Sequence, residues 1–191
     1  MIKNIMIVGV GGQGTLLASK ILGAAAFAGG YDVKISEVHG MSQRGGSVVT
    51  YVRYGESVSS PVICRGEADV IIAFELLEAA RWLPYLKKDG IIIANTQQLN
   101  PMPVITGAAV YPGALTEKIS GTGAKLIAAD AYSEAVAAGT DRAVNIVLLG
   151  VFASIWDFDR TVFTDGIKNT VAPKFVDINL NAFERGYSLA K

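Results

Sequence analysis

The sequence predicts one α/β domain over residues 1–191, a three-layer α/β/α sandwich around a Rossmann-like, mixed and mostly parallel sheet. Short apolar runs of strand length alternate with segments of helical periodicity along the whole chain. The strand patterns at 31–38 and 47–55 are joined by too few residues for a crossover helix, so this pair should run antiparallel. A chain of 191 residues is also long enough to bury a sizeable core by itself.

The individual elements follow from the hydrophobic pattern. Strands are expected at 2–10, 31–38, 47–55, 68–74 and 89–96, with a short edge segment at 60–63. Helices are expected at 14–30, at 75–86, as a turn within 115–123, and over most of the tail from 142 to 191. Residues 124–139 indicate a strand that leads into a helix, and Pro84 should disturb the end of the helix at 75–86. Residues 100–113 are expected to be irregular.

The composition excludes several classes of function. Lys+Arg and Asp+Glu balance at 17 each, so no net positive field draws in nucleic acid. No run of 18 apolar residues is present and no cleavable signal opens the chain, so we expect a cytoplasmic protein without a membrane anchor. Half of the residues are hydrophobic, which is typical of a fully covered parallel sheet or of a surface hidden against a partner.

The residue types indicate neither a metal site nor catalysis by this chain alone. The single cysteine, Cys64, cannot form an internal disulfide, and by itself it cannot hold zinc or an iron–sulfur cluster. His39 is the only imidazole, and a hydrogen-bonded structural role is favoured over catalysis. We therefore assign no catalytic residue and no metal ligand to this chain.

A glycine loop is the first candidate site. Gly9, Gly11 and Gly14 fit G-x-G-x-x-G between a strand and a helix, and Gly12 and Gln13 lie in the same loop. Such loops place free N–H groups and the positive end of a helix dipole against an anion. The alternatives are a loop that only permits a tight turn and a dinucleotide site in which Glu37, at the end of the second strand, binds ribose hydroxyls.

A second loop carries the residues Gln43-Arg44-Gly45-Gly46. The Arg44 guanidinium offers a rigid fork of donors for a phosphate or a carboxylate, Gln43 adds a neutral donor, and Gly45 and Gly46 leave backbone N–H groups accessible. The alternatives are an ion pair with Glu37 and contact with a partner subunit. We expect the first two strands to be neighbours, which would bring this loop close to the glycine loop.

Four other polar residues are expected to be structural. Glu75 should favour the start of a helix, Asn95 should form a turn at the end of a strand, and Asn145 needs a partner inside an apolar helix. Arg142 is expected to be solvated.

Several segments of the sequence together resemble a known family. "GVGGQGTLLASKIL", "EVHGMSQRGGSVV", "SPVICRGEADVIIAFELLEAARWLPYL" and "GIIIANT", with "RAVNIVLLG" and "NLNAFERGY", are similar to the gamma-type subunit of 2-oxoacid:ferredoxin oxidoreductases. Within that family the likeness is greatest to the small (beta) subunit of the indolepyruvate enzymes, and it covers most of the chain.

The resemblance implies a subunit that is not catalytic alone. Thiamine diphosphate, Mg and 4Fe–4S clusters would belong to partner subunits, and ferredoxin would be reached through the complex. The chain would complete the active site and help to bind coenzyme A, with Gly9, Gly11, Gly12, Gln13, Gly14, Gln43, Arg44, Gly45 and Gly46 as the candidate contacts. In isolation it could form a homo-oligomer. The alternatives are a stand-alone Rossmann-type dinucleotide-binding oxidoreductase and a docking subunit with no ligand contact.

Overall fold

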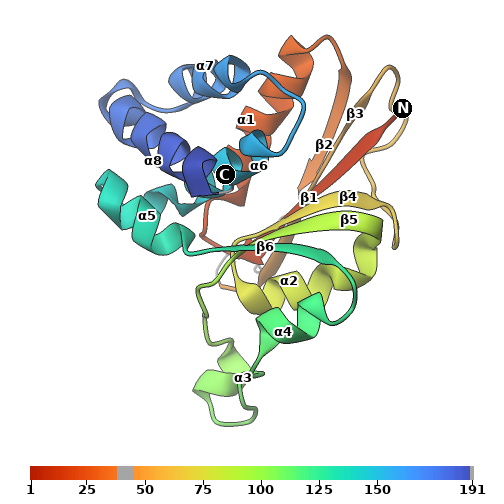
Figure 1. The fold of residues 1–191 in the computed structure, drawn as a ribbon, viewed down its shortest axis with the longest axis vertical. Coiled ribbons are helices and arrows are strands. Elements are labelled where there is room, and N and C mark those ends of the chain that lie inside the picture. The colour runs from red at the N-terminus through yellow and green to blue at the C-terminus, as the bar shows by residue number, and fades with distance from the viewer. Residues whose placement is uncertain (38–44, 190–191) are drawn as a thin grey trace.

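A mixed sheet forms the middle layer of the computed structural model, which describes residues 1–37 and 45–189 (Figure 1). Its strands are β1 (Lys3–Val10), β2 (Asp32–Glu37), β3 (Ser47–Gly55), β4 (Ala68–Ala73), β5 (Leu86–Asn95) and β6 (Lys125–Ala129). They are arranged in the order β2-β3-β1-β4-β5-β6. β1, β4, β5 and β6 are parallel, and β3 is antiparallel to both β1 and β2. The predicted mixed, mostly parallel sheet is confirmed.

Helices cover both faces of this sheet and complete the predicted three layers (Figure 1). One face carries α1 (Thr15–Ala28), α5 (Ala131–Ala138), α6 (Val144–Ser154), α7 (Arg160–Thr170) and α8 (Val176–Leu189). The other carries α2 (Leu76–Trp82) and α4 (Leu115–Ser120), while α3 (Met102–Ile105) lies on a projection. As expected, α2 changes at Pro84 into a short 3-10 turn, Leu83–Tyr85.

The buried strands show why this sequence needs two covering layers. Every residue of β4 is buried, because side chains that alternate along a strand point to opposite faces and both faces are covered. Ile72 packs into the core under α1 and α6, whereas Ile71 packs into the core under α2 and α4. A strand with one solvated face would have alternated with polar residues instead.

Two helices on the larger face approach each other through glycine. A Cβ atom on Gly186 in α8 would lie 1.9 Å from the carbonyl oxygen of Val147 in α6, and one on Gly150 would lie 2.2 Å from that of Phe183. The missing side chains therefore let the backbones of α6 and α8 touch. α6 is buried nearly all round, yet no helix among the described residues is long and apolar enough to cross a membrane.

The predicted neighbourhood of the first two strands is wrong, because β3 lies between β1 and β2. β3 is apolar and mostly buried, whereas the shorter β2 carries Asp32, Lys34 and Glu37 and no residue buried from solvent. Charged strands suit the edge of a sheet, where they discourage pairing with other chains. The apolar strand therefore takes the inner position. The short edge segment expected at 60–63 forms no strand.

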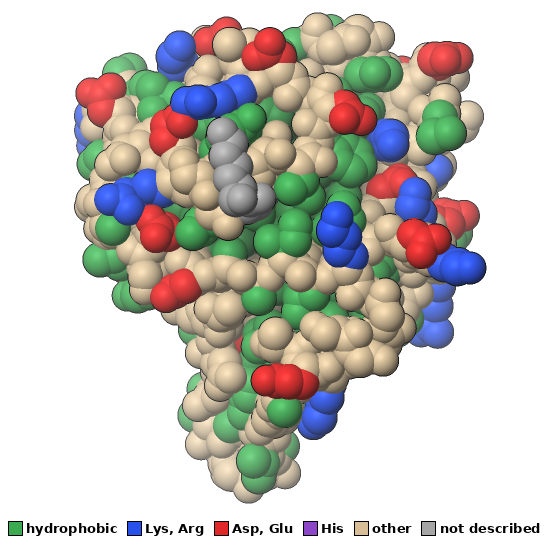
Figure 2. All heavy atoms as spheres, in the orientation of Figure 1, with side chains coloured by type: hydrophobic (Ala, Val, Ile, Leu, Met, Phe, Trp, Pro, Cys, Tyr) green, Lys and Arg blue, Asp and Glu red, His purple; other side chains and the backbone are tan. Residues whose placement is uncertain are grey.

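A projection leaves the sheet after β5 and returns to α4. We call residues 97–113 the neutral arm, since the chain has no charged residue between Asp89 and Glu117. The arm contains α3 and extends away from the body of the molecule (Figure 1), and apolar side chains lie at its tip (Figure 2). Residues 100–113 are mostly irregular, as expected, and contain one short helical turn.

Candidate functional site

The glycine loop joins β1 to α1 and has the shape of an anion-binding turn. Gly12 has φ +100° and Gly14 has φ +85°, both in the left-handed region that favours glycine. Gly14 is the N-cap of α1, where no side chain caps the helix and no acidic residue occupies the first turn. The positive end of the α1 dipole is thus left without a carboxylate on its own helix.

Gly9 and Gly14 of the motif have separate tasks in the structure. Gly9 lies inside β1, and a Cβ atom there would be 2.8 Å from Gln13 Oε1 and 3.0 Å from the Phe74 Cβ. Gly9 therefore makes room for the Gln13 side chain instead of forming the turn. A Cβ atom on Gly14 would be 2.8 Å from Asn145 Nδ2, so the absence of a side chain lets the start of α6 pack closely against the loop. Gly14 is therefore required both for this contact and for its positive φ.

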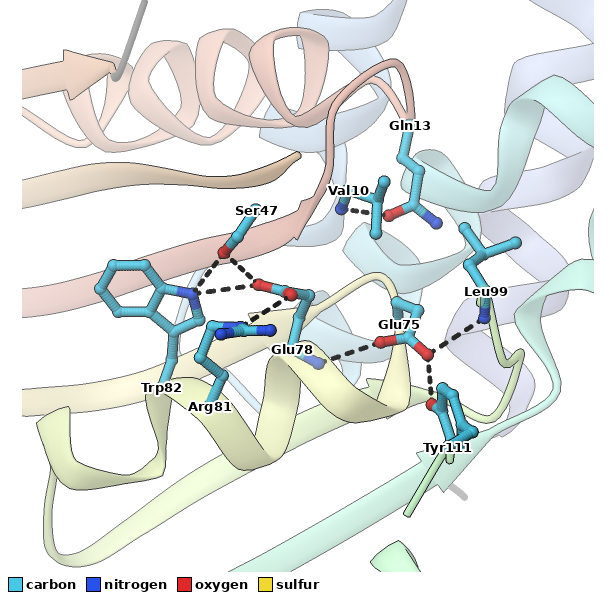
Figure 3. Close-up of polar contacts among 9 residues, drawn as sticks. All are labelled: Val10, Gln13, Ser47, Glu75, Glu78, Arg81, Trp82, Leu99 and Tyr111. Atoms are coloured by element: carbon cyan, nitrogen blue, oxygen red, sulfur yellow. Dashed lines mark hydrogen bonds and ion pairs between the residues drawn. The ribbon is translucent and has the colours of Figure 1, made fainter. Parts of the chain in front are cut away.

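The Gln13 side chain is a structural bridge between strand ends. Its Oε1 accepts a hydrogen bond from the Val10 N–H at 2.7 Å (Figure 3), and its Nε2 donates to the Phe74 carbonyl at 3.0 Å. These bonds join the end of β1 to the end of β4, the two strands from which the chain leaves toward opposite faces of the sheet. The amide thus fixes the loop at the place where doubly wound sheets bind ligands.

Asn145 supports the same loop from the other side. Its Nδ2 donates to the Gly14 carbonyl at 3.2 Å and its Oδ1 accepts from the Ile146 N–H at 2.9 Å. The side chain is almost fully buried. The expectation that Asn145 finds a partner within the core is confirmed, and that partner belongs to the candidate site.

The described part of the second loop meets the glycine loop. The Gly11 N–H donates to the Gly46 carbonyl at 2.8 Å, and Gly45 has φ +93°. The two loops meet because β3 runs antiparallel beside β1, so that its first residue lies at the carboxyl end of β1. His39, Gln43 and Arg44 lie outside the described residues. The ligand contacts of Gln43 and Arg44 and the structural role of His39 stay predictions.

Three clefts surround this meeting point. The first, about 330 Å³, lies between the glycine loop, the end of β2 and the start of β3. The second, about 310 Å³, lies between Gly45–Ser47, α2 and the base of the neutral arm. The third, about 560 Å³, lies between the glycine loop and the first residues of α5 and α6, and it includes Arg142. These clefts differ in charge, which decides what each can hold.

The cleft beside α2 is acidic, but its carboxylates are already satisfied (Figure 3). Glu78 accepts hydrogen bonds from Ser47 Oγ and from Trp82 Nε1, and it forms an ion pair with Arg81 at 3.0 Å. The Glu78 side chain is about 5% exposed. Since a buried carboxylate is stable only when paired, this cluster holds the second loop and α2 in place.

Glu75 performs the corresponding task for the neutral arm. It is the N-cap of α2 and accepts from the Glu78 N–H at 3.0 Å, as the sequence leads one to expect. It also accepts from the Leu99 N–H at 3.2 Å and from the Tyr111 hydroxyl (Figure 3). Burial, followed by this bond to Glu75, raises the pKa of Tyr111 above its ordinary value. Both ends of the arm are thus tied to one buried carboxylate.

Asn95 also proves structural. Its Nδ2 donates to the Phe74 carbonyl at 3.2 Å, and its Oδ1 accepts from the Ala131 N–H at 3.2 Å. These bonds tie the end of β5 to the end of β4 and to the start of α5. Asn95 is fully buried and therefore cannot meet a ligand directly.

The sequence indicated no ligand-binding role for the side chains that line the third cleft. Gln97, Tyr132 and Arg142 line it together with Gly12–Gly14, and Asp141 adds one carboxylate. Among the described residues, the Arg142 side chain has no hydrogen-bond acceptor or ion-pair partner. The available signal was topological, because Gln97 and Tyr132 follow β5 and β6 at the same carboxyl edge of the sheet.

A dinucleotide site of the ordinary kind does not fit the strand order. In such sites the acidic residue ends a strand next to the glycine loop. Here Glu37 ends β2, which is two strands from β1 and thus roughly 10 Å away at the usual strand spacing. Its Oε1 also accepts a hydrogen bond from Ser19 Oγ at 3.3 Å. The alternative of a stand-alone Rossmann-type oxidoreductase is therefore not favoured.

No cluster of three metal-ligating side chains occurs among residues 1–37 and 45–189. Cys64 is exposed, which differs from the buried apolar role that a lone cysteine usually has. Its backbone N–H donates to Glu67 Oε2 at 3.0 Å, so this residue belongs to a surface turn at the opposite edge of the sheet from the glycine loop.

Known proteins share both the sequence and the fold. A family model described as pyruvate ferredoxin/flavodoxin oxidoreductase matches residues 4–189. Indolepyruvate oxidoreductase subunit IorB of Thermococcus kodakarensis is 44% identical over 194 residues, which cover 98% of this chain and 96% of the relative. Pyruvate oxidoreductase subunit PORC of Thermotoga maritima has a solved structure with a TM-score of 0.76 and 23% identity, covering 98% of this chain and 96% of that one.

A third similar structure is a larger protein. It is 2-oxoglutarate:ferredoxin oxidoreductase from Magnetococcus marinus, solved with 2-oxoglutarate, coenzyme A and succinyl-CoA bound. The match has a TM-score of 0.75 at 19% identity and covers 99% of this chain but 31% of that one. The same fold therefore exists both as a separate subunit and as one part of a longer chain.

The chain belongs to the pyruvate ferredoxin/flavodoxin oxidoreductase family, and relatives that match it over nearly its whole length are subunits of indolepyruvate oxidoreductases. The resemblance stated from the sequence, including the likeness to the indolepyruvate enzymes, is confirmed.

Proposed function

We propose that this chain is the noncatalytic subunit of a thiamine diphosphate-dependent 2-oxoacid:ferredoxin oxidoreductase, in which it completes the active site and helps to bind coenzyme A. The likeness to an indolepyruvate oxidoreductase subunit over nearly the whole chain favours indolepyruvate, or another keto acid, as the substrate. Thiamine diphosphate, Mg and 4Fe–4S clusters belong to partner subunits and supply the oxidative chemistry. One cysteine cannot replace the four thiolates of a cubane cluster.

The convergence of the two glycine-containing loops carries this proposal. The Gly11–Gly46 hydrogen bond joins the described end of the second loop to the glycine loop, which supports the proposal that both candidate segments serve one site. Coenzyme A carries phosphates, which suit free N–H groups at the start of α1 and a guanidinium. Its neutral pantetheine arm can reach a partner subunit.

The third cleft adds a cation that suits this ligand. Arg142 lines it beside Gly12–Gly14 and has no described protein partner for its guanidinium. Arg142 is therefore available for a phosphate, although Asp141 adds a carboxylate to the same cleft. By contrast, no cation is present among the described residues that line the cleft near Glu37, and Arg81 in the cleft near Glu78 is already paired with Glu78. We assign Arg142 and the glycine loop to the phosphate end of the ligand and Arg44 to the same ligand from the second loop.

The test uses the chain reconstituted with its purified catalytic subunit. We expect 2-oxoacid-dependent, coenzyme A-dependent reduction of ferredoxin by the complex and none by the isolated chain. Arg44→Ala and Arg142→Ala should each raise the apparent KM for coenzyme A by about 10-fold or more, as expected for loss of a charge-assisted hydrogen bond. Arg65→Ala, an exposed arginine at the opposite edge of the sheet, is the matched control.

Two results would contradict the proposal in different ways. A chain that purifies without an iron- and thiamine-containing partner from its native host would contradict the subunit assignment. An unchanged KM for coenzyme A in both arginine variants would contradict the proposed ligand contact and favour the alternative, a docking subunit with no ligand contact.

A further inference from the structure

The neutral arm has the composition of a protein interface and lies on the outside of the molecule. Met102 and Ile105 are each 65% exposed, and Val110 is 90% exposed. No charged residue accompanies them between Asp89 and Glu117, although charged residues make up 18% of the chain. Isolated exposed apolar residues are ordinary, but a long segment without charge is typical of the core of an interface.

The arm is also held in a fixed shape. The Ile105 and Thr106 N–H groups close the α3 turn on Pro101 and Met102, and the Ala109 N–H donates to the Pro103 carbonyl at 3.0 Å. Glu75 holds the base of the arm through Leu99 and Tyr111. A preformed apolar projection loses little conformational entropy when a partner covers it, so its shape favours binding.

The position of the arm connects it to the candidate site. It leaves β5 at the carboxyl edge of the sheet, where the glycine loop leaves β1, because these strands are parallel through β4. The base of the arm, Leu99–Pro103, lines the same cleft as Gly45–Ser47. A protein that covers the candidate site at this edge of the sheet would therefore lie next to the arm.

We propose that the neutral arm is a docking element for the catalytic subunit of the same complex, and this inference rests on the proposed function. Uncharged apolar side chains require an apolar, uncharged recess on the partner. A second copy of this chain fits less well. Two arms meeting at their tips would contribute only a few side chains each, against roughly 20–30 residues a side in a specific interface. A catalytic subunit that covers the site and the arm together reaches that size.

A matched pair of substitutions tests the inference. Val110→Asp introduces a carboxylate at a 90% exposed site of the arm, and Val62→Asp makes the same change at a 51% exposed site on the opposite edge of the sheet. We expect Val110→Asp to weaken binding to the purified catalytic subunit by about 100-fold or more, since a buried unpaired charge is costly. Val62→Asp should bind like the wild type. Binding is measured by calorimetry with the full chains.

Two further measurements separate the outcomes. Ile105→Asp should repeat the loss of Val110→Asp, while the melting temperature and the coenzyme A-induced thermal shift of both isolated variants stay at the wild-type values. Arm variants that bind the catalytic subunit normally would overturn the inference, and so would an equal loss in Val62→Asp. If the arm variants lost only self-association and still bound the catalytic subunit normally, the arm would be a contact between two copies of this chain. That result would also overturn the inference. A wild-type chain that does not bind the catalytic subunit would instead contradict the proposed function.

Discussion

The two sides of the glycine loop differ in how their polar groups are satisfied. On the α2 side, Glu75 and Glu78 are buried and are paired with donors from the protein itself. On the α6 side, Arg142 faces a larger cleft and its guanidinium has no acceptor among the described residues. Buried pairs maintain a shape, whereas an unpaired cation beside an anion-binding turn is available to a ligand. Substitutions on the α2 side should therefore change stability, and those on the α6 side should change binding.

Glu75→Ala should have the largest effect on stability. It leaves the Glu78 N–H, the Leu99 N–H and the Tyr111 hydroxyl without their acceptor, and two of these donors hold the neutral arm. We expect the free energy of unfolding to fall by about 3 kcal/mol, because buried donors that lose their partner pay their desolvation cost. Urea denaturation at pH 7 measures this. Glu75→Gln keeps one acceptor and should lose less, and a loss below about 0.5 kcal/mol in Glu75→Ala, the size of an ordinary surface substitution, would contradict the structural role.

Gly14→Ala and Gly12→Ala separate backbone strain from close packing within the glycine loop. Both glycines have positive φ, so each substitution should cost about 1 kcal/mol in strain. A Cβ atom at Gly14 would also meet Asn145 Nδ2 at 2.8 Å, whereas nothing lies within 4 Å of one at Gly12. We therefore expect Gly14→Ala to lose about 2 kcal/mol, roughly twice as much as Gly12→Ala, since overpacking adds its own cost. Equal losses in urea denaturation would show that Asn145 moves aside freely.

The sequence predicted the parts of this site that are local along the chain. The β1–loop–α1 unit follows from an apolar strand, a run of glycines and helical periodicity over adjacent residues. The antiparallel pairing of β2 and β3 followed from the short connection between them. The family resemblance came from several such segments together.

The contacts that the sequence could not predict join residues far apart along the chain. Gln13 was a candidate ligand, but its amide bridges to Phe74, which lies 61 residues away. Gly14 packs against Asn145, 131 residues away, and Arg142 enters the site on the same segment. The position of β3 between β1 and β2 depends on which strand is more apolar overall, and spacing alone does not indicate this. Tertiary packing decided each of these points.

Tyr111→Phe should have a smaller effect that depends on pH. Burial and the bond to Glu75 raise the pKa of Tyr111, so the folded state favours the neutral hydroxyl. Its contribution is complete below the ordinary tyrosine pKa of about 10 and is lost as the pH rises toward the higher folded pKa. The substitution should cost about 1–2 kcal/mol at pH 7, the cost of leaving a buried acceptor with one donor fewer.

The pH series supplies the check on Tyr111. The difference in unfolding free energy between the wild type and Tyr111→Phe should shrink between pH 9 and pH 11. Comparing the two chains is necessary because Tyr51 and Tyr54 also have raised pKa values and contribute equally to both. A difference that stays constant over this range would show that the Tyr111 hydroxyl does not stabilise the fold through its neutral form.

Arg142→Ala should have the smallest effect on stability and thereby sharpens the contrast between the two sides. Because the guanidinium has no described partner, its removal should change the free energy of unfolding by less than about 0.5 kcal/mol, as for an ordinary surface substitution. Asn145→Ala, three residues further on, removes the bond to the Gly14 carbonyl and should cost about 1–3 kcal/mol. Urea denaturation of the two variants compares them directly. A loss in Arg142→Ala as large as that in Asn145→Ala would mean that Arg142 is part of the scaffold, and its availability to a phosphate would no longer follow from the structure.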